Sequence, residues 1–82
     1  MVMTQYVKLL WDFYGKDSKK TSEHHLIHLI DFLKSHNIPC EENGIDNTSE
    51  DQFSTFIVIN MIKINIIKDN LKPNRAFLHG PK

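Results

Sequence analysis

The sequence predicts an α+β fold in which an antiparallel sheet carries two helices on one of its faces. Apolar residues alternate with period two in some segments and recur with a helical period in others. In chain order these segments read β-α-β-β-α-β, and a chain of 82 residues has room for a single core. This order is typical of the ferredoxin-like fold, in which the first and third strands are central. Right-handed crossovers then fix how the strands are connected.

The first predicted element is a strand from about Thr4 to Tyr14, and a polar turn over Gly15–Lys20 follows it. Successive side chains of a strand point to opposite faces of a sheet. One alternate set is apolar and is expected to face the helices: Val7, Leu9, Trp11 and Phe13.

A helix is predicted over about Ser22–His36, with Thr21 or Ser22 as the residue that caps its first turn. Its apolar residues recur at i, i+3, i+4 and i+7, which gives a core stripe of Leu26, Leu29, Ile30 and Leu33. Asn37 can adopt the left-handed conformation that ends a helix, and Pro39 prevents its continuation.

The second half of the chain contains three predicted strands. A short strand is expected near Cys40–Ile45, and both Asn43-Gly44 and the run from Asp46 to Gln52 are rich in turn residues. Phe53–Ile59 is rich in β-branched and aromatic residues, which indicates a buried strand. A last short strand is expected over about Arg75–Leu78.

Residues 61–71 are open to two interpretations. Met61, Ile64, Ile67 and Leu71 form a helical stripe, whereas residues 62–66 alternate as a strand would. We expect a helix, because Asn60 can cap its start and Pro73 can end it.

Composition and charge narrow the classes of function. Ten basic residues balance ten acidic ones, so we expect no nucleic acid partner, because neutralisation of phosphates supplies most of that affinity. No apolar stretch is long enough for a membrane span, and we expect neither a membrane partner nor a signal peptide. The single cysteine, Cys40, cannot form an internal disulfide, which favours a cytoplasmic location. We also expect no cofactor, since the three glycines form no phosphate-binding loop.

The sheet face away from the helices is expected to be apolar. Tyr6, Leu10 and Tyr14 point to this open face if their neighbours face the helices. Large exposed apolar patches mark interaction surfaces, and isologous dimers are the commonest assembly. We therefore expect a homodimer packed sheet to sheet, with a small-molecule ligand held in its cleft as one use. The alternatives are a different protein bound at this face, or a monomer whose tyrosines and Lys8 stem cover it.

Histidines cluster near the start of the first predicted helix. His24 and His28 lie at i and i+4 on one helical face, and Asp31 lies at i+3 from His28. Two imidazoles and a carboxylate are a reasonable ligand set for a divalent metal. Metalloproteases, however, need a glutamate directly after the first histidine, and His25 is there instead. We therefore expect solvated histidines and no metal.

The predicted topology gives the same histidines a second use. The first helix begins near the end of the first strand, and the antiparallel last strand begins at that same edge. Seven residues could therefore converge at one corner: Trp11, Asp12, Tyr14, His24, His25, His28 and Arg75. A histidine near a helix N-terminus favours its neutral form, so a histidine with Asp12 and Arg75 would make an acid–base or anion-binding set. The alternative is a buried aromatic cluster with a few satisfied polar groups.

In the segment Phe13–Asn37 a strand ends, a polar turn follows, and a helix contains the pattern H-L-x-x-L with His25, Leu26 and Leu29. This order resembles the start of the YCII-related dimeric ferredoxin-like proteins. The resemblance implies a histidine, carried over to His25, that works with an aspartate in a cleft formed by the dimer. The aspartate has no matching position here, because no aspartate precedes a proline in the second half of the chain.

The sequence names no ligand, substrate or pathway. It favours a non-enzymatic role, as a homodimeric interaction or small-ligand-binding module made of one domain over residues 1–82, with a tail from about residue 79 that frays. The first alternative is a small dimeric enzyme of YCII-like type with a His/Asp acid–base site. The second is a subunit that binds a different protein through its open sheet face.

Overall fold

The computed structural model describes residues 5–79, apart from the side chain of Thr48. Its elements follow in the order β1 (Tyr6–Tyr14), α1 (Ser18–Ser35), β2 (Cys40–Ser49), β3 (Gln52–Asn60), the 3-10 turn η1 (Met61–Lys63), α2 (Ile64–Leu71) and β4 (Arg75–His79). The predicted strand start at Thr4 and residues 80–82 of the predicted tail lie outside the described residues. His79, where that tail was expected to begin, is the last residue of β4.

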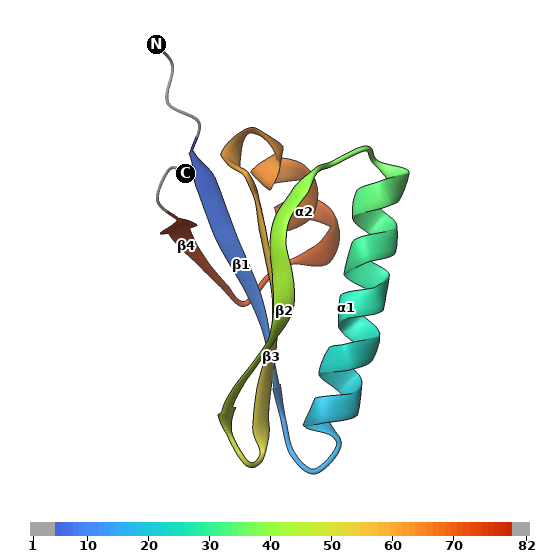
Figure 1. Ribbon diagram of the computed structural model, residues 1–82, viewed down its shortest axis with the longest axis vertical. Coiled ribbons are helices and arrows are strands. Elements are labelled where there is room, and N and C mark those ends of the chain that lie inside the picture. Colours follow the sequence, from blue (N-terminus) through green and yellow to red (C-terminus); the bar gives the residue numbers. More distant parts are fainter. Residues whose placement is uncertain (1–4, 80–82) are drawn as a thin grey trace.

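The four strands form one antiparallel sheet in the order β2-β3-β1-β4 (Figure 1). β1 pairs with both β3 and β4, and its register places Tyr6 opposite Asn60 and Tyr14 opposite Gln52. β1 and β3 are therefore the central strands, as their apolar content predicts, while β2 and β4 form the edges. The predicted α+β class is confirmed by this sheet and the two helices.

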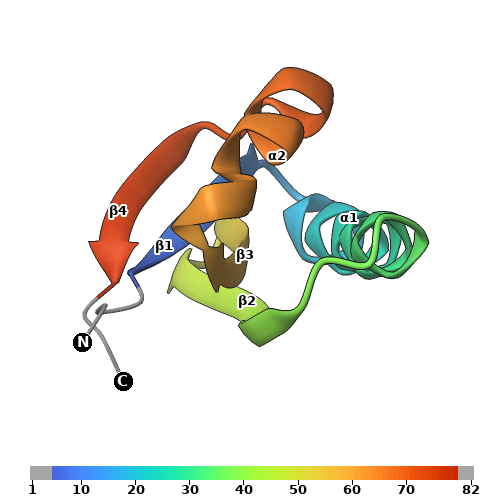
Figure 2. The same cartoon turned by 90° about the horizontal axis from the view of Figure 1, so that it is seen from above.

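Both helices lie on the same side of the sheet (Figure 2). The core combines alternate residues of the central strands with residues from both helices: Val7, Leu9, Trp11, Ile57, Ile59, Leu29, Leu33 and Ile67, joined by Ile38. This confirms which side of the first strand faces the helices. Each aliphatic side chain buried in this way contributes about 1.5–3 kcal/mol relative to exposure, so this layer supplies much of the stabilisation.

α1 begins one turn earlier than predicted, at Ser18 rather than Ser22. The chain reverses within residues 15–17, starting at Gly15, whose φ of 105° suits glycine and strains other residues. The lysines that follow are good helix formers, so the expected polar turn becomes helix. Ser22, the expected cap, is buried within the helix. The predicted helix end is confirmed, because Asn37 has a φ of 55°.

β2 continues through the segment predicted to be turn-rich. Asn43 and Gly44 lie within the strand, and the chain reverses at Glu50–Asp51 instead. Gly44 lies opposite Phe56 in register, and a Cβ atom there would approach the Phe56 ring to 3.0 Å. The glycine therefore permits a close approach between strands rather than a turn.

Residues 61–71 are helical, as expected, with η1 leading into α2. The side chain of Asn60 accepts a hydrogen bond from the Ile62 N–H at 2.9 Å, which confirms the predicted cap. Lys72 adopts a left-handed φ of 45° directly after the helix. Pro73 follows, so the predicted end is also confirmed.

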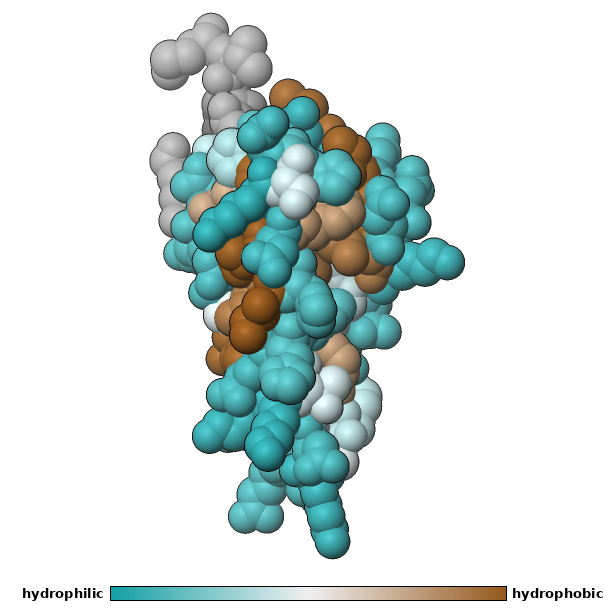
Figure 3. Space-filling model, turned by 90° about the vertical axis from the view of Figure 1, so that its right-hand side faces the viewer, coloured by the Kyte–Doolittle hydropathy of each residue, from teal (hydrophilic) through white to brown (hydrophobic). Residues whose placement is uncertain are grey.

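The outer surface on the α1 side is mostly hydrophilic. Its hydrophobic residues gather in the middle and upper parts of the view (Figure 3). No described helix is long and apolar enough to cross a membrane.

Candidate functional site

The sheet divides the predicted corner into two clusters. Because neighbouring strand residues point to opposite faces, Trp11 points to the helices and Asp12 to the open face. Arg75 is opposite Leu10 in register, which places it on the open face with Asp12. His25 lies against Trp11 on the helix face. The structure therefore brings Asp12 and Arg75 together and leaves His25 on the other side of the sheet from them.

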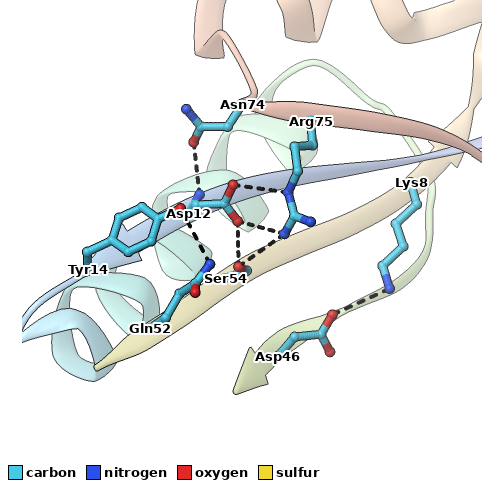
Figure 4. Close-up of polar contacts among 8 residues, drawn as sticks. All are labelled: Lys8, Asp12, Tyr14, Asp46, Gln52, Ser54, Asn74 and Arg75. Carbon is cyan, nitrogen blue, oxygen red and sulfur yellow. Dashed lines mark hydrogen bonds and ion pairs between the residues drawn. The ribbon is translucent and has the colours of Figure 1, made fainter. Parts of the chain in front are cut away.

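The open-face cluster centres on the Asp12 carboxylate (Figure 4). Arg75 donates to both carboxylate oxygens, from Nη2 at 2.7 Å and from Nε at 3.0 Å. Ser54, buried on β3, donates through Oγ at 2.6 Å. The side chain of Asn74 accepts a hydrogen bond from the Asp12 backbone N–H at 2.8 Å. The cluster ties the start of β4 to both central strands.

Asp12 stays ionised in this cluster. Burial raises the pKa of its carboxyl group, but the hydrogen bonds from Ser54 and Arg75 and the guanidinium charge outweigh burial, so the pKa falls below 3.8. A general base works best with a pKa near the working pH. A carboxylate bound in this bidentate way is a poor base, so the cluster is suited to holding β4 in place rather than to proton transfer.

His25 packs against two aromatic rings on the helix face. The centre of its ring lies 5.3 Å from that of Trp11 and 5.3 Å from that of Phe13. Its Nε2 atom is buried and has no hydrogen-bond partner among the described residues. Burial, and secondarily the nearby His28, lower the pKa of His25 below 6.5. The ring is therefore neutral at pH 7.

Trp11 and the end of α2 complete this side of the corner. The indole N–H of Trp11 donates to the Leu71 carbonyl oxygen at 2.8 Å. The end of α2 leaves backbone carbonyls without partners inside the helix, and this bond satisfies one of them. The Trp11 side of the corner thus matches the alternative of a buried aromatic cluster, with His25 Nε2 as its unsatisfied polar atom.

His24, His28 and Asp31 are exposed on α1. Within residues 5–79, no group of three His, Cys, Asp or Glu side chains is placed so that it could hold a metal ion. The i, i+4 spacing therefore does not assemble a metal centre in the described part of the chain.

The open face is less apolar than predicted, because Leu10 is only 4% exposed. Its neighbours across the sheet are Phe56 and Arg75, whose large side chains cover it although no helix lies on this face. This corrects the expectation that Leu10 belongs to an exposed patch. Tyr14 is 71% exposed and Tyr6 is half-buried, so a binding role for the two tyrosines stays a prediction.

Ion pairs cross the same face. Lys8 Nζ lies 3.5 Å from Asp46 Oδ2. His79 Nε2 lies 3.8 Å from Glu42 Oε2, although two strands separate β4 from β2 in the sheet. Side chains of the two edge strands therefore meet over the central strands. Val58, between Lys8 and Glu42 in register, is fully buried there.

Two neighbouring apolar residues that the sequence analysis missed are exposed on β4. Phe77 is 52% exposed on the open face, and Leu78 is 72% exposed on the helix face. β4 is an edge strand, and within residues 5–79 no strand pairs with its outer side. The signal in the sequence was the dipeptide Phe77-Leu78, because two successive large apolar residues in a strand point to both faces.

Cys40 has a half-buried free thiol at the start of β2. Its Sγ donates to the Glu42 carbonyl oxygen at 3.0 Å. Burial raises the pKa of the Cys40 thiol above 9.0, so the thiol stays protonated at pH 7 and is a poor nucleophile.

Comparisons of the chain with protein-family models, curated proteins and solved structures find no match. Its own side chains therefore provide the indications of its function. The two features with consequences for function are the paired charges of the open face and the apolar side chains of β4.

Proposed function

We propose that the chain is a self-associating interaction module, a homodimer whose contact surface is β4. One observation carries the proposal: large apolar side chains are exposed on both faces of this strand, Phe77 on one and Leu78 on the other. Single exposed apolar residues are normal on protein surfaces. Two of them in succession on an edge strand, beside exposed Ala76, leave apolar side chains on both sides of an unpaired strand edge, where association can bury them.

A ferredoxin-like topology is part of this proposal. It is supported by the element order β-α-β-β-α-β and by a sheet order with β1 and β3 at the centre. Such a fold leaves β4 at one edge, where a partner has access to it. A cytoplasmic location is also proposed, and the free thiol of Cys40 supports it.

Packing two open faces against each other is a weaker candidate for the contact. Two ion pairs lie on this face, Asp12 with Arg75 and Lys8 with Asp46, and His79 contacts Glu42 there as well. Burying such pairs removes their hydration, which often costs more than the attraction between the charges returns. Leu10, which was expected to drive that packing, is already buried by its own chain. We therefore assign the contact to β4.

Sedimentation velocity over a wide concentration range tests the proposal. We expect the mass to rise from monomer to dimer with concentration, and Leu78→Ser to shift this transition to higher concentration. Ile27→Ser is the matched control, because Ile27 is an exposed apolar residue on α1, and it should leave the transition unchanged. A monomer at the highest concentration would contradict the homodimer and favour a different protein as partner.

An acid–base enzyme is the second candidate, favoured by the neutral, unpaired Nε2 of His25. Asp12 lies on the other face of the sheet, so the carboxylate partner would have to come from elsewhere. Screening small molecules by the ring-proton NMR signals of His25 tests this candidate. A ligand that shifts those signals, and that no longer binds to the His25→Gln variant, would support it.

A further inference from the structure

The two edge strands differ in how they resist pairing with another chain. β2 carries Glu41, Glu42 and Asp46, and its register with β3 shifts at Cys40/Glu42 and at Asn47/Ser49, as it does at a bulge or similar irregularity. Charges and bulges are the devices by which natural edge strands block association. β2 is therefore a protected edge.

β4 has no register shift along its described length and carries only one strong charge. Its residues, R-A-F-L-H, form a regular ladder with β1 without a register shift. The one strong charge, Arg75, is turned towards the sheet by its two bonds to Asp12. Its other ionisable side chain, His79, lies near Glu42 across the open face. The outer edge of β4 thus offers backbone donors and acceptors flanked by apolar side chains.

The side chains of β4 also complement a second copy of the same strand. If two copies run antiparallel about a two-fold axis at Phe77, Phe77 lies opposite its own counterpart, a favourable aromatic pair. Leu78 then lies opposite the partner's Ala76 on the helix face, so a large side chain meets a small one. Arg75 lies opposite the partner's His79, and each already has an acidic neighbour in its own chain.

We propose that β4 of two copies pair edge to edge in this antiparallel register, which joins the two sheets into one continuous sheet. This inference rests on the proposed self-association and specifies its geometry. A two-fold axis perpendicular to the sheet keeps both open faces on one side and all the helices on the other. The occupant of the β4 edge is thus a second copy of this chain.

The contact is small, since β4 contributes five residues from each copy. Interfaces at the low end of the size range are transient, so we expect a concentration-dependent dimer in rapid exchange. Ile62 is also exposed, and it lies at the same end of the sheet as Leu78. It follows Asn60 in the chain, and Asn60, Tyr6 and His79 lie side by side on neighbouring strands.

Disulfide trapping tests the register directly. In the Cys40→Ser background, Phe77→Cys would place two thiols opposite each other at the two-fold axis. Residues directly opposite in an antiparallel pair have Cα atoms about 4.5–5.5 Å apart, within the range that a disulfide spans. We expect rapid oxidation to a covalent dimer. Tyr14→Cys in the same background is the control. Tyr14 is exposed, and it lies at the opposite end of β1 from Tyr6, where β1 pairs with β4, so this variant should cross-link slowly.

Charge at the edge provides the second test. The variant Ala76→Lys/Leu78→Lys places like charges directly opposite each other twice across the proposed pair. We expect the dissociation constant to rise by at least about tenfold, with an unchanged circular dichroism spectrum, since both side chains are exposed. Ile27→Lys, on exposed α1, is the matched control and should dimerise as the unaltered protein does.

Hydrogen exchange separates the two levels of the proposal. Edge pairing predicts that the β4 amides directed away from β1 gain protection as concentration rises. A dimer that shows no such protection, resists the two lysines and fails to cross-link through Phe77→Cys would overturn the edge geometry while keeping the homodimer. A protein that stays monomeric at all concentrations would overturn both.

Discussion

The two faces of the sheet bury apolar side chains by different means. On the helix face, Leu9 is covered by a layer to which α1 and α2 both contribute. On the open face, the next residue, Leu10, is almost equally buried with no helix above it. Its cover consists of long and aromatic side chains from the neighbouring strands, held in part by ion pairs. Complete burial of one residue therefore does not require a second layer of secondary structure.

The two kinds of cover differ in how they respond to change. The helix layer is close-packed, so a deleted methyl group leaves a cavity that the surroundings fill poorly. The cover on the open face consists of flexible side chains beside solvent, which can shift to fill a gap. It also depends on charges, so pH acts on it. Four predictions can break or sharpen this contrast, from the largest expected effect to the smallest.

The largest expected effect separates two adjacent leucines. Leu9→Ala should lower the free energy of unfolding by about 3–4 kcal/mol, and Leu10→Ala by about 2 kcal/mol, because the open face can relax into the gap. Urea unfolding followed by circular dichroism measures both. If Leu9→Ala fails to fold, Leu9→Val and Leu10→Val give the same comparison on a smaller scale. Equal losses at the two positions would contradict the contrast.

The next effect concerns the ionised carboxylate of the open face. Asp12→Asn keeps the shape but removes the charge that Arg75 binds, and should lower the free energy of unfolding by about 1.5 kcal/mol at pH 7. The pKa of Asp12 is lower in the folded state than the usual 3.8. Its stabilisation is therefore complete well above pH 3.8 and is lost as pH falls through the folded-state pKa.

Unfolding experiments from pH 7 to pH 3 provide the measurement for Asp12→Asn. The difference from the unaltered protein should shrink below about pH 4. A difference that does not vary with pH would show that shape, not charge, holds this cluster together.

A gain in stability is expected on the helix face. His25→Phe replaces a ring that has an unpaired buried nitrogen, and should raise the free energy of unfolding by about 1 kcal/mol. Because the pKa of His25 is lowered from 6.5 in the folded state, the unfolded chain binds more protons below that pH. The unaltered protein should therefore lose stability as pH falls below 6.5, and the variant should lose less. His24→Gln, at an exposed position, is the control and should keep the original pH dependence.

The smallest effect tests the flexibility of the cover on the open face. Gly44→Ala brings a methyl group to 3.0 Å from the Phe56 ring, which the Lys8 ammonium covers at 4.4 Å. The ring can shift towards solvent, so we expect a loss of only about 0.5 kcal/mol. A double-mutant cycle with Phe56→Leu should return most of it. A loss of several kcal/mol would mean that the open face is as rigid as the core.

Periodicity predicted the central strands and the helix-facing side of β1, because these depend on local alternation alone. It also implied that Trp11 and Asp12 point to opposite faces, so the division of the predicted corner could have been read from the sequence. The boundaries of α1 and β2 could not be read from the sequence in this way. The presence of Gly44 within β2, for example, is explained by the Phe56 ring across the strand pair and not by the residues next to it in the chain. The burial of Leu10 likewise depends on register with β3 and β4.

The short reversal at Glu50–Asp51 also has a consequence for the order in which the sheet folds. It allows β2 and β3 to pair as a hairpin within about 1–10 μs, whereas Asp12 and Ser54, which link β1 to β3, are 42 residues apart. Closing that longer loop costs more entropy, so the slow step in folding should be the docking of β1 onto an existing hairpin. Destabilising the hairpin would then slow folding, whereas loosening β4 would mainly accelerate unfolding.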